Sequence, residues 1–175
     1  MAADHTDRGP DVRAPPPEKK PSLSIDRLTH ADVPAVCGLY KRVADSQGPG
    51  LPVEIVKTWQ PSPLEFTSRM EGITYFVARR DGRLVGAVGC ESRHGSCHLL
   101  DLAVEPDARH QGVATALLGA AVEWAKRSNL PTVWADVLAR YPIVPGLLKK
   151  LGFVEAGLLH RHEWAEDVRL FERVL

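Results

Sequence analysis

The chain has 175 residues, of which 44% are hydrophobic and 25% are charged, proportions that are typical of a soluble globular domain. Its 22 basic and 22 acidic side chains cancel, so no excess charge favours nucleic acid or an anionic membrane as a partner. The sequence has no apolar run that would cross a bilayer and no signal-peptide pattern, and three scattered cysteines do not form a disulfide framework. We therefore expect a cytoplasmic protein that binds neither nucleic acid nor membrane and is free to form a homodimer.

Residues 1–22 differ in composition from the rest of the chain. They contain five prolines and no aromatic residue, and their four acidic side chains are balanced by four basic ones. Such a segment buries too little apolar surface to offset the entropy that is lost when a chain becomes ordered. We predict a disordered, proline-rich tail over residues 1–22 and one folded domain over residues 23–175.

The domain begins with an alternation of apolar and polar residues that predicts a strand over 23–28. Thr29 is suited to cap the helix that apolar spacing predicts over 31–44. Residues 46–63 contain four prolines and little regular period, so we expect a loop or a broken helix there. A short helix is predicted over 64–70.

The middle of the domain reads as a β-hairpin followed by a third strand. Two apolar runs, 73–78 and 84–90, flank Asp81-Gly82, and Asp-Gly between apolar runs is a strong short-range signal for a hairpin. A strand over 97–104 is predicted to follow.

The second half alternates helices and strands. An amphipathic helix is predicted over 112–126, then a strand over 131–138, a helix over 143–151, and strands over 153–159 and 168–175. A strand–helix–strand crossover within mostly antiparallel strands predicts an α/β (α+β) three-layer fold. We expect a mixed, mostly antiparallel sheet of about seven strands with helices on both faces.

The loop between the strand over 97–104 and the next helix carries the clearest chemical signal. A helix N-terminus presents unpaired backbone N–H groups and the positive end of the helix dipole, which suits a phosphate group. Gly112 and Ala114 keep the first turn bare, and Arg109 can add a charge-assisted contact. A P-loop and a dinucleotide fingerprint do not fit, because their glycines are absent. A loop that merely needs a small residue fits the same pattern.

Arg109-x-x-Gly112-x-Ala114 resembles the acyl-CoA pyrophosphate loop of the GNAT superfamily of N-acetyltransferases, whose signature is Arg/Gln-x-x-Gly-x-Gly/Ala. Residues 147–153 resemble that superfamily's leucine-tyrosine-x-x-x-glycine-phenylalanine segment, and residues 25–32 resemble its first strand and helix. The resemblance implies a GNAT-like sheet whose splayed central strands hold acetyl-CoA. It also implies direct transfer of an acetyl group, in a ternary complex and with no metal, to a primary amine on a small molecule or a peptide.

The resemblance places the donor-binding residues on two segments. The backbone of Leu102, Ala103 and Val104 would pair with the pantetheine arm and polarise the thioester carbonyl. The backbone of the loop would bind the pyrophosphate. The loop residues are Arg109, His110, Gln111, Gly112, Val113 and Ala114.

The candidate catalytic residues depart from the family pattern. His98 stands where the family often has a glutamate, and an imidazole can accept a proton near neutral pH; the alternative is a surface histidine at a strand end. Asp101 is a second candidate base, unless it only pairs with an arginine or a backbone group. Tyr141 stands where the family often has asparagine and is a third catalytic candidate, whereas Leu148 replaces the family's tyrosine and can do no proton chemistry.

Three residues are expected to contact the acceptor: Trp59 in the irregular segment, Asp136 on a neighbouring strand, and His162 near the last hairpin. No Cys-x-x-Cys or His-Glu-x-x-His spacing predicts a metal site. The competing function is a non-catalytic acyl-CoA-binding or sensor module of the same fold, which Leu148 favours.

Overall fold

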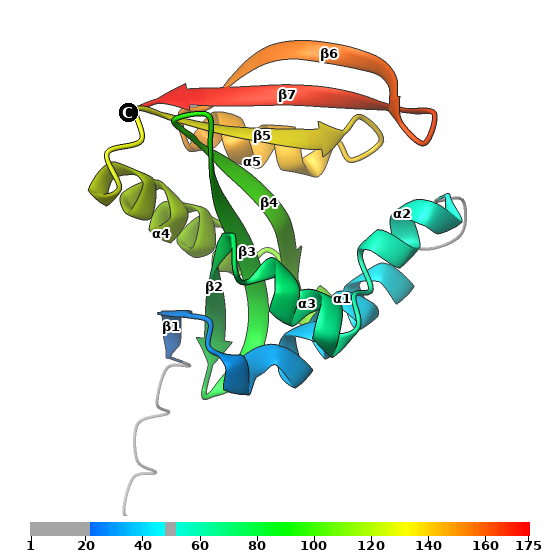
Figure 1. Cartoon of the computed structure of the whole chain (residues 1–175), viewed down its shortest axis with the longest axis vertical. Helices are drawn as coiled ribbons and strands as arrows, with labels where there is room; N and C mark the ends of the chain where they lie inside the picture. The colour runs from blue at the N-terminus through cyan, green and yellow to red at the C-terminus, as the bar shows by residue number, and fades with distance from the viewer. Residues whose placement is uncertain (1–21, 48–51) are drawn as a thin grey trace, which may run out of the picture.

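The structure is a computed structural model that describes residues 22–47 and 52–175 (Figure 1). The predicted tail, apart from Ser22, lies outside these residues. Seven strands form one sheet, which confirms the predicted number, and their order is β1-β2-β3-β4-β5-β7-β6. The strands are β1 (Leu23–Arg27), β2 (Ile73–Arg80), β3 (Arg83–Arg93), β4 (Ser96–Val104), β5 (Thr132–Leu138), β6 (Val154–Glu163) and β7 (Glu166–Val174). The helices are α1 (Val33–Asp45), α2 (Val53–Thr58), α3 (Pro63–Arg69), α4 (Val113–Arg127) and α5 (Ile143–Lys150), with 3-10 turns at His30–Asp32 and Pro106–Ala108.

The sheet is mixed because β4 and β5 are parallel, whereas every other pairing of the described strands is antiparallel. The parallel pairing is short: residues 97–99 of β4 pair with residues 133–135 of β5. Beyond that point the two strands diverge (Figure 1), so the edge of β4 that faces β5 has no strand partner from Leu100 onward. The predicted splay of the central strands is confirmed.

Helices cover both faces of the sheet, as predicted. Buried side chains of α1 and α3, such as Leu39 and Phe66, pack with Tyr75 and Val77 of β2 on one face. Helix α4 buries a stripe of residues three to five positions apart on the other face, where α5 also packs. Each of the larger side chains, such as Leu39, Phe66 and Leu117, contributes roughly 1.5 to 3 kcal/mol when it is fully buried. None of the described helices is both long and apolar enough to span a bilayer.

A β-bulge in β4 changes which side chains face which layer. Ala103 pairs with Ala87 and Leu100 with Gly89, so two residues of β4, Asp101 and Leu102, stand opposite one residue of β3. Asp101 has a positive φ of 54°, which is uncommon for a residue other than glycine. Because of the extra residue, Leu102 packs toward the α4 side, whereas Ala103 joins the core under α1 and α3.

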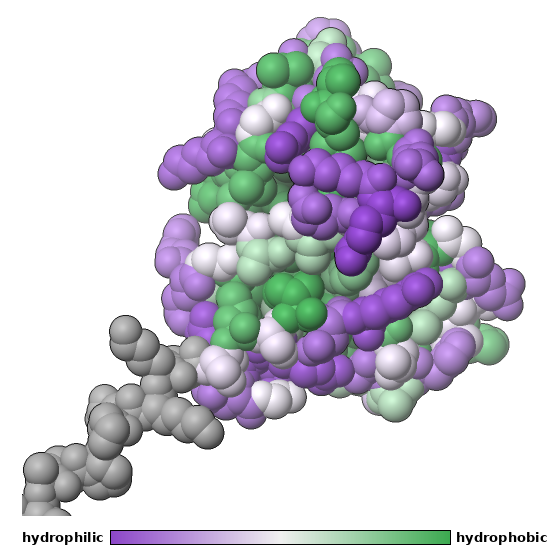
Figure 2. Space-filling view, turned by 90° about the vertical axis from the view of Figure 1, so that its left-hand side faces the viewer, coloured by the Kyte–Doolittle hydropathy of each residue, from purple (hydrophilic) through white to green (hydrophobic). Residues whose placement is uncertain are grey.

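The elements differ from the prediction mainly in their extent. The segment predicted as a loop or a broken helix contains α2, and β3 and β6 extend beyond the apolar runs because polar residues continue their ladders. The predicted Asp81-Gly82 hairpin is confirmed, with φ of 49° and 83° at the two turn residues. Figure 2 shows the side of the molecule at the left of Figure 1, where hydrophilic side chains separate several smaller hydrophobic patches.

Candidate active site

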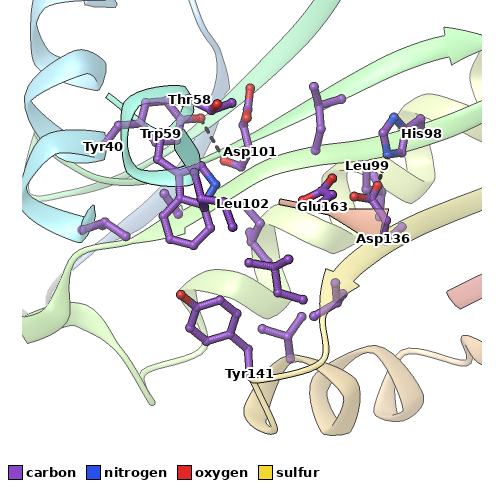
Figure 3. A pocket seen from close by; sticks show the side chains of 18 of the residues that line it. Tyr40, Thr58, Trp59, His98, Leu99, Asp101, Leu102, Asp136, Tyr141 and Glu163 are labelled. Carbon is purple, nitrogen blue, oxygen red and sulfur yellow. Dashed lines mark hydrogen bonds and ion pairs between the residues drawn. The ribbon is translucent and has the colours of Figure 1, made fainter. Parts of the chain in front are cut away.

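A cavity of about 430 Å³ lies where β4 and β5 diverge (Figure 3). Its walls come from both sides of the sheet: residues of α1, α2 and α3 line one side, and residues of α4 and α5 line the other. The last residue of β6 and the turn after it close one end. The ionisable side chains that line it are Tyr40, Arg69, His98, Asp101, Asp136, Tyr141 and Glu163.

His98 and Asp136 form a hydrogen-bonded pair in this cavity. Parallel pairing places His98 beside Trp134, and the two rings stack with centroids 3.8 Å apart and planes 9° apart. Asp136 lies two residues further along β5, on the same face as Trp134. Its Oδ1 is 2.5 Å from Nε2 of His98, whose side chain is only 12% exposed. His98 therefore lines the cavity and is not a surface histidine.

The electrostatics of the pair favour an ionised Asp136. Burial raises the pKa of Asp136, but the hydrogen bond and the charge of His98 outweigh burial, so the pKa of this carboxyl lies below its ordinary value. The short contact therefore places one proton between Nε2 of His98 and the carboxylate. The other ring nitrogen, Nδ1, is buried without a hydrogen-bond partner among the described residues, and Oε2 of Glu91 lies 3.7 Å from it.

Asp101 is engaged in holding the β4 bulge. Its Oδ2 accepts a hydrogen bond of 2.7 Å from the Tyr75 hydroxyl and lies 3.7 Å from Nη1 of Arg69. Its carbonyl oxygen accepts a bond of 2.9 Å from the Tyr40 hydroxyl. Burial, followed by the charge of Asp101, raises the pKa of both tyrosines, so they stay protonated as donors. These contacts match the structural alternative, an aspartate that pairs with an arginine, better than a free base.

Tyr141 brings an unsatisfied hydroxyl to the cavity. Its ring packs against Trp59 of the α2 segment with centroids 5.9 Å apart, and its buried hydroxyl has no hydrogen-bond partner among the described residues. Burial raises the pKa of this hydroxyl, which therefore remains a donor. Leu148 also lines the cavity and is 1% exposed, so the family's tyrosine position carries only an apolar side chain.

The loop before α4 has the geometry of an anion site. Gly112 immediately precedes α4 with a φ of 80°, and nothing lies within 4 Å of the position where a Cβ would stand. No side chain caps α4, so the N–H groups of its first turn have no partner within the helix. Arg109 donates to the Val104 carbonyl (3.3 Å) and to Ser46 Oγ (3.1 Å), which holds its guanidinium between the end of β4 and α1.

The structure places two of the three predicted acceptor residues in the lining of the cavity. Trp59 and Asp136 line the cavity, but His162 is exposed and does not; Glu163 and Trp164 line it instead. The ladder of β6 and β7 explains the difference. Three residues of β6 separate Leu159 from Glu163, whereas one residue of β7 separates their partners, so strict alternation fails at this bulge. Sequence reasoning missed Glu163; the only signal was its place beside His162 in the last hairpin.

The comparisons with known proteins converge on one family. The sequence model of the acetyltransferase (GNAT) family matches residues 38–153. The crystal structure of the ribosomal-protein-S18-alanine N-acetyltransferase from Escherichia coli aligns with a TM-score of 0.71 at 22% identity, over 87% of this chain and 94% of that one. A PaiA N-acetyltransferase from Thermoplasma acidophilum in complex with coenzyme A aligns with a TM-score of 0.70 at 16% identity, over 88% and 99%.

Among curated sequences, human N-acetyltransferase 8B is 30% identical over 105 residues, which are 57% of this chain and 46% of that protein. An uncharacterized N-acetyltransferase of Methanocaldococcus jannaschii, MJ1207, is 27% identical over 108 residues, which are 57% of this chain and 47% of that protein. The chain therefore spans about half the length of the curated relatives it matches.

Proposed function

Because the chain belongs to the acetyltransferase (GNAT) family, we propose that it transfers an acetyl group from acetyl-CoA to a primary amine by direct attack in a ternary complex. One observation carries the proposal: a cavity lies where strands β4 and β5 diverge and holds the His98–Asp136 pair, and the bare N-terminus of α4 follows β4 along the chain. A donor and an acceptor can therefore meet in the sheet.

The chain's own residues fit acetyl-CoA as the donor. The open space beside Gly112 and the unpaired N–H groups of the first turn of α4 suit its pyrophosphate. The unpartnered edge of β4, over Leu102, Ala103 and Val104, suits the amide groups of the pantetheine arm and can polarise a carbonyl. Acetyl-CoA would supply the acetyl thioester. We assign His110, Gln111, Val113 and Ala114 to the same loop through their backbone.

We assign proton acceptance to the His98–Asp136 pair. An alkylammonium of pKa ~10.4 must lose a proton before it attacks, at a cost of ~4 to 5 kcal/mol at pH 7. The proton that leaves the amine is taken up at Nδ1, the ring nitrogen of His98 without a hydrogen-bond partner, and the imidazole becomes an imidazolium between two carboxylates, Asp136 at 2.5 Å from Nε2 and Glu91 at 3.7 Å from Nδ1. The stack on Trp134 fixes the ring while its charge changes. Asp101 supports this step by holding the bulge.

We assign to Tyr141 the contact with the CoA sulfur atom that leaves. Its buried, unpartnered hydroxyl can donate a hydrogen bond to a thiolate, and its raised pKa keeps that donor protonated. Full protonation of the sulfur is not required, because a thiol has a pKa of only ~8.5 and its thiolate leaves readily. A tyrosine at 141 thus compensates for Leu148.

Acetyl-CoA mixed with a panel of primary amines tests the proposal, with thiol release and the mass of the product as readouts. Amine-dependent thiol release supports acetyl transfer. The alternative, an acyl-CoA-binding module without turnover, is favoured by the leucine at 148, and it predicts calorimetric binding of acetyl-CoA with no thiol release for any amine.

A further inference from the structure

The turn between β6 and β7 places Glu163 in the cavity. The bulge in β6 lies just before Glu163, and the residues around it have positive φ: 50° at Arg161, 42° at Trp164 and 67° at Ala165. A positive φ is an uncommon backbone conformation for residues other than glycine, and the surrounding structure holds such residues in place. As a result, Glu163 points into the cavity near Asp136 (Figure 3), and Trp164 lies beside it, 49% exposed.

Glu163 pairs with no arginine or lysine among the described residues. Among the described residues it makes no hydrogen bond or ion pair, although other carboxylates of the same hairpin do. Glu166, its cross-strand neighbour, pairs with Arg140 at 3.0 Å. Asp167 accepts a hydrogen bond of 2.8 Å from the backbone of Arg161. Glu163 therefore brings to the cavity a carboxylate that has no salt bridge or hydrogen bond among the described residues.

The cavity as a whole has an excess of negative charge. Three carboxylates line it, and the one guanidinium among the described lining residues, that of Arg69, is committed to Asp101 and to the Thr58 carbonyl. Burial and the charge of Asp136 raise the pKa of Glu163 and outweigh the opposite effect of His162 and His98, so its ionised form is only partly compensated. A cationic group of a bound molecule would supply the remaining compensation, whereas a carboxylate group would find no uncommitted arginine or lysine among the described residues that line the cavity.

We propose that Glu163 is a specificity-determining residue that binds a cationic group of the acceptor, so that the acceptors are amines carrying a second positive charge and no carboxylate. This inference rests on the proposed function, because it places the acceptor in this cavity. His98 and Asp136 accept the proton of the reacting nitrogen, and Glu163 binds the second cationic group of the acceptor. Amines that bear a carboxylate, such as free amino acids, are disfavoured.

Three amines of equal chain length test the inference: butane-1,4-diamine, butan-1-amine and 4-aminobutanoate. Calorimetry measures their binding to the full chain saturated with CoA, which does not depend on turnover. We expect the diamine to bind at least ~10-fold more tightly than 4-aminobutanoate. Glu163→Gln should reduce that ratio to about 2-fold or less, and Glu163→Lys should reverse it, because the carboxylate charge is removed or inverted.

Glu172→Gln is the matched control, since Glu172 lies exposed on β7 outside the cavity, and it should leave the ratio unchanged. Equal affinities for the diamine and 4-aminobutanoate, no measurable binding of the diamine, or a ratio that survives Glu163→Gln would each overturn the inference. Thiol release from acetyl-CoA in the same samples reports on the proposed function separately. A diamine that binds selectively without thiol release would count against acetyl transfer but not against charge selection by Glu163.

Discussion

Replacing Gly112 separates the backbone's role in folding from its role in binding the donor. Because a Cβ at this position meets nothing within 4 Å, an added side chain costs only the strain of a φ of 80°, about 1 to 2 kcal/mol. For a domain of this size that strain lowers the melting temperature by roughly 2 to 8 °C. Gly112→Ala and Gly112→Asp should therefore both fold.

The two variants should differ in their affinity for acetyl-CoA. The aspartate adds a negative charge to the space assigned to the pyrophosphate. One pair of like charges ~5 Å apart repels by roughly 3 kcal/mol at an effective dielectric constant of ~20, before screening by solvent. We expect Gly112→Asp to weaken binding ~10- to 100-fold, or ~1.4 to 2.8 kcal/mol, as measured by calorimetry. Gly112→Ala should lose less affinity for acetyl-CoA than Gly112→Asp, because alanine adds no charge.

Gly95 provides the matched control for this experiment. It lies in the turn between β3 and β4 with a φ of 78°, and nothing stands within 4 Å of its absent Cβ. Gly95→Asp should therefore cost a similar amount of stability and leave the affinity for acetyl-CoA unchanged. A folded Gly112→Asp protein that binds acetyl-CoA like the unmodified chain would refute the assignment of the loop.

Further variants test the proton acceptor, the sulfur contact and a buried ion pair. His98→Ala should slow transfer by ~10² to 10⁴ in kcat/KM without changing the affinity for acetyl-CoA, and equal rates would remove the histidine from the mechanism. Because folding lowers the pKa of Asp136, this carboxylate stabilises the fold above pH ~4, and the contribution is lost as the pH falls through the folded pKa. The free energy of unfolding of Asp136→Asn, measured with urea, should therefore fall less steeply at acid pH than that of the unmodified chain. Tyr141→Phe keeps the packing on the neighbouring tryptophan, so it should lower kcat but not the melting temperature; an unchanged kcat would contradict a bond to sulfur. Arg42→Met removes the hydrogen bonds of 2.5 and 2.8 Å that the buried carboxylate of Glu105 accepts. We expect it to lower the free energy of unfolding by about 2 to 3 kcal/mol, less than the ~3 to 5 kcal/mol of a fully buried pair, because the arginine side chain is 53% exposed. Changing both Arg42 and Glu105 to Met should recover most of the lost stability.

Periodicity was sufficient to predict where most of the elements lie, because helices such as α1 and α4 and the strands β2 and β3 bury apolar side chains at regular spacing. The stripe of α4 and the Asp-Gly turn between β2 and β3 depend only on residues close together in the chain. The same holds for the loop at Gly112, whose proposed function as an anion site is inferred from a helix N-terminus and a missing side chain. Local signals of this kind do not require knowledge of the sheet order.

The part of the cavity that we assign to the acceptor was not predictable in the same way. It depends on two β-bulges, and the alternation of apolar and polar residues does not reveal them. The bulge at Asp101 reverses the alternation of β4, so a residue that a regular strand would turn toward the α4 side instead contacts Tyr75 and Arg69. The bulge before Glu163 does the same in β6 and exchanges an expected histidine for a glutamate. Each bulge turns a charged side chain to the opposite face of the sheet, which changes the chemical groups that line the cavity.

The substitution at Leu148 gains its meaning only from the packing around it. Read alone, a leucine in the tyrosine position removes a hydroxyl from the site and favours a module that binds without turnover. In the fold, Tyr141 and Leu148 line the same cavity from the segment after β5 and from α5, and the hydroxyl at 141 is buried with no partner. A buried hydroxyl without a hydrogen bond costs roughly 1 to 3 kcal/mol, a cost that a ligand atom can relieve. Under the proposed function, Tyr141 supplies the hydroxyl that Leu148 lacks, and Leu148 completes the cavity wall with an apolar side chain.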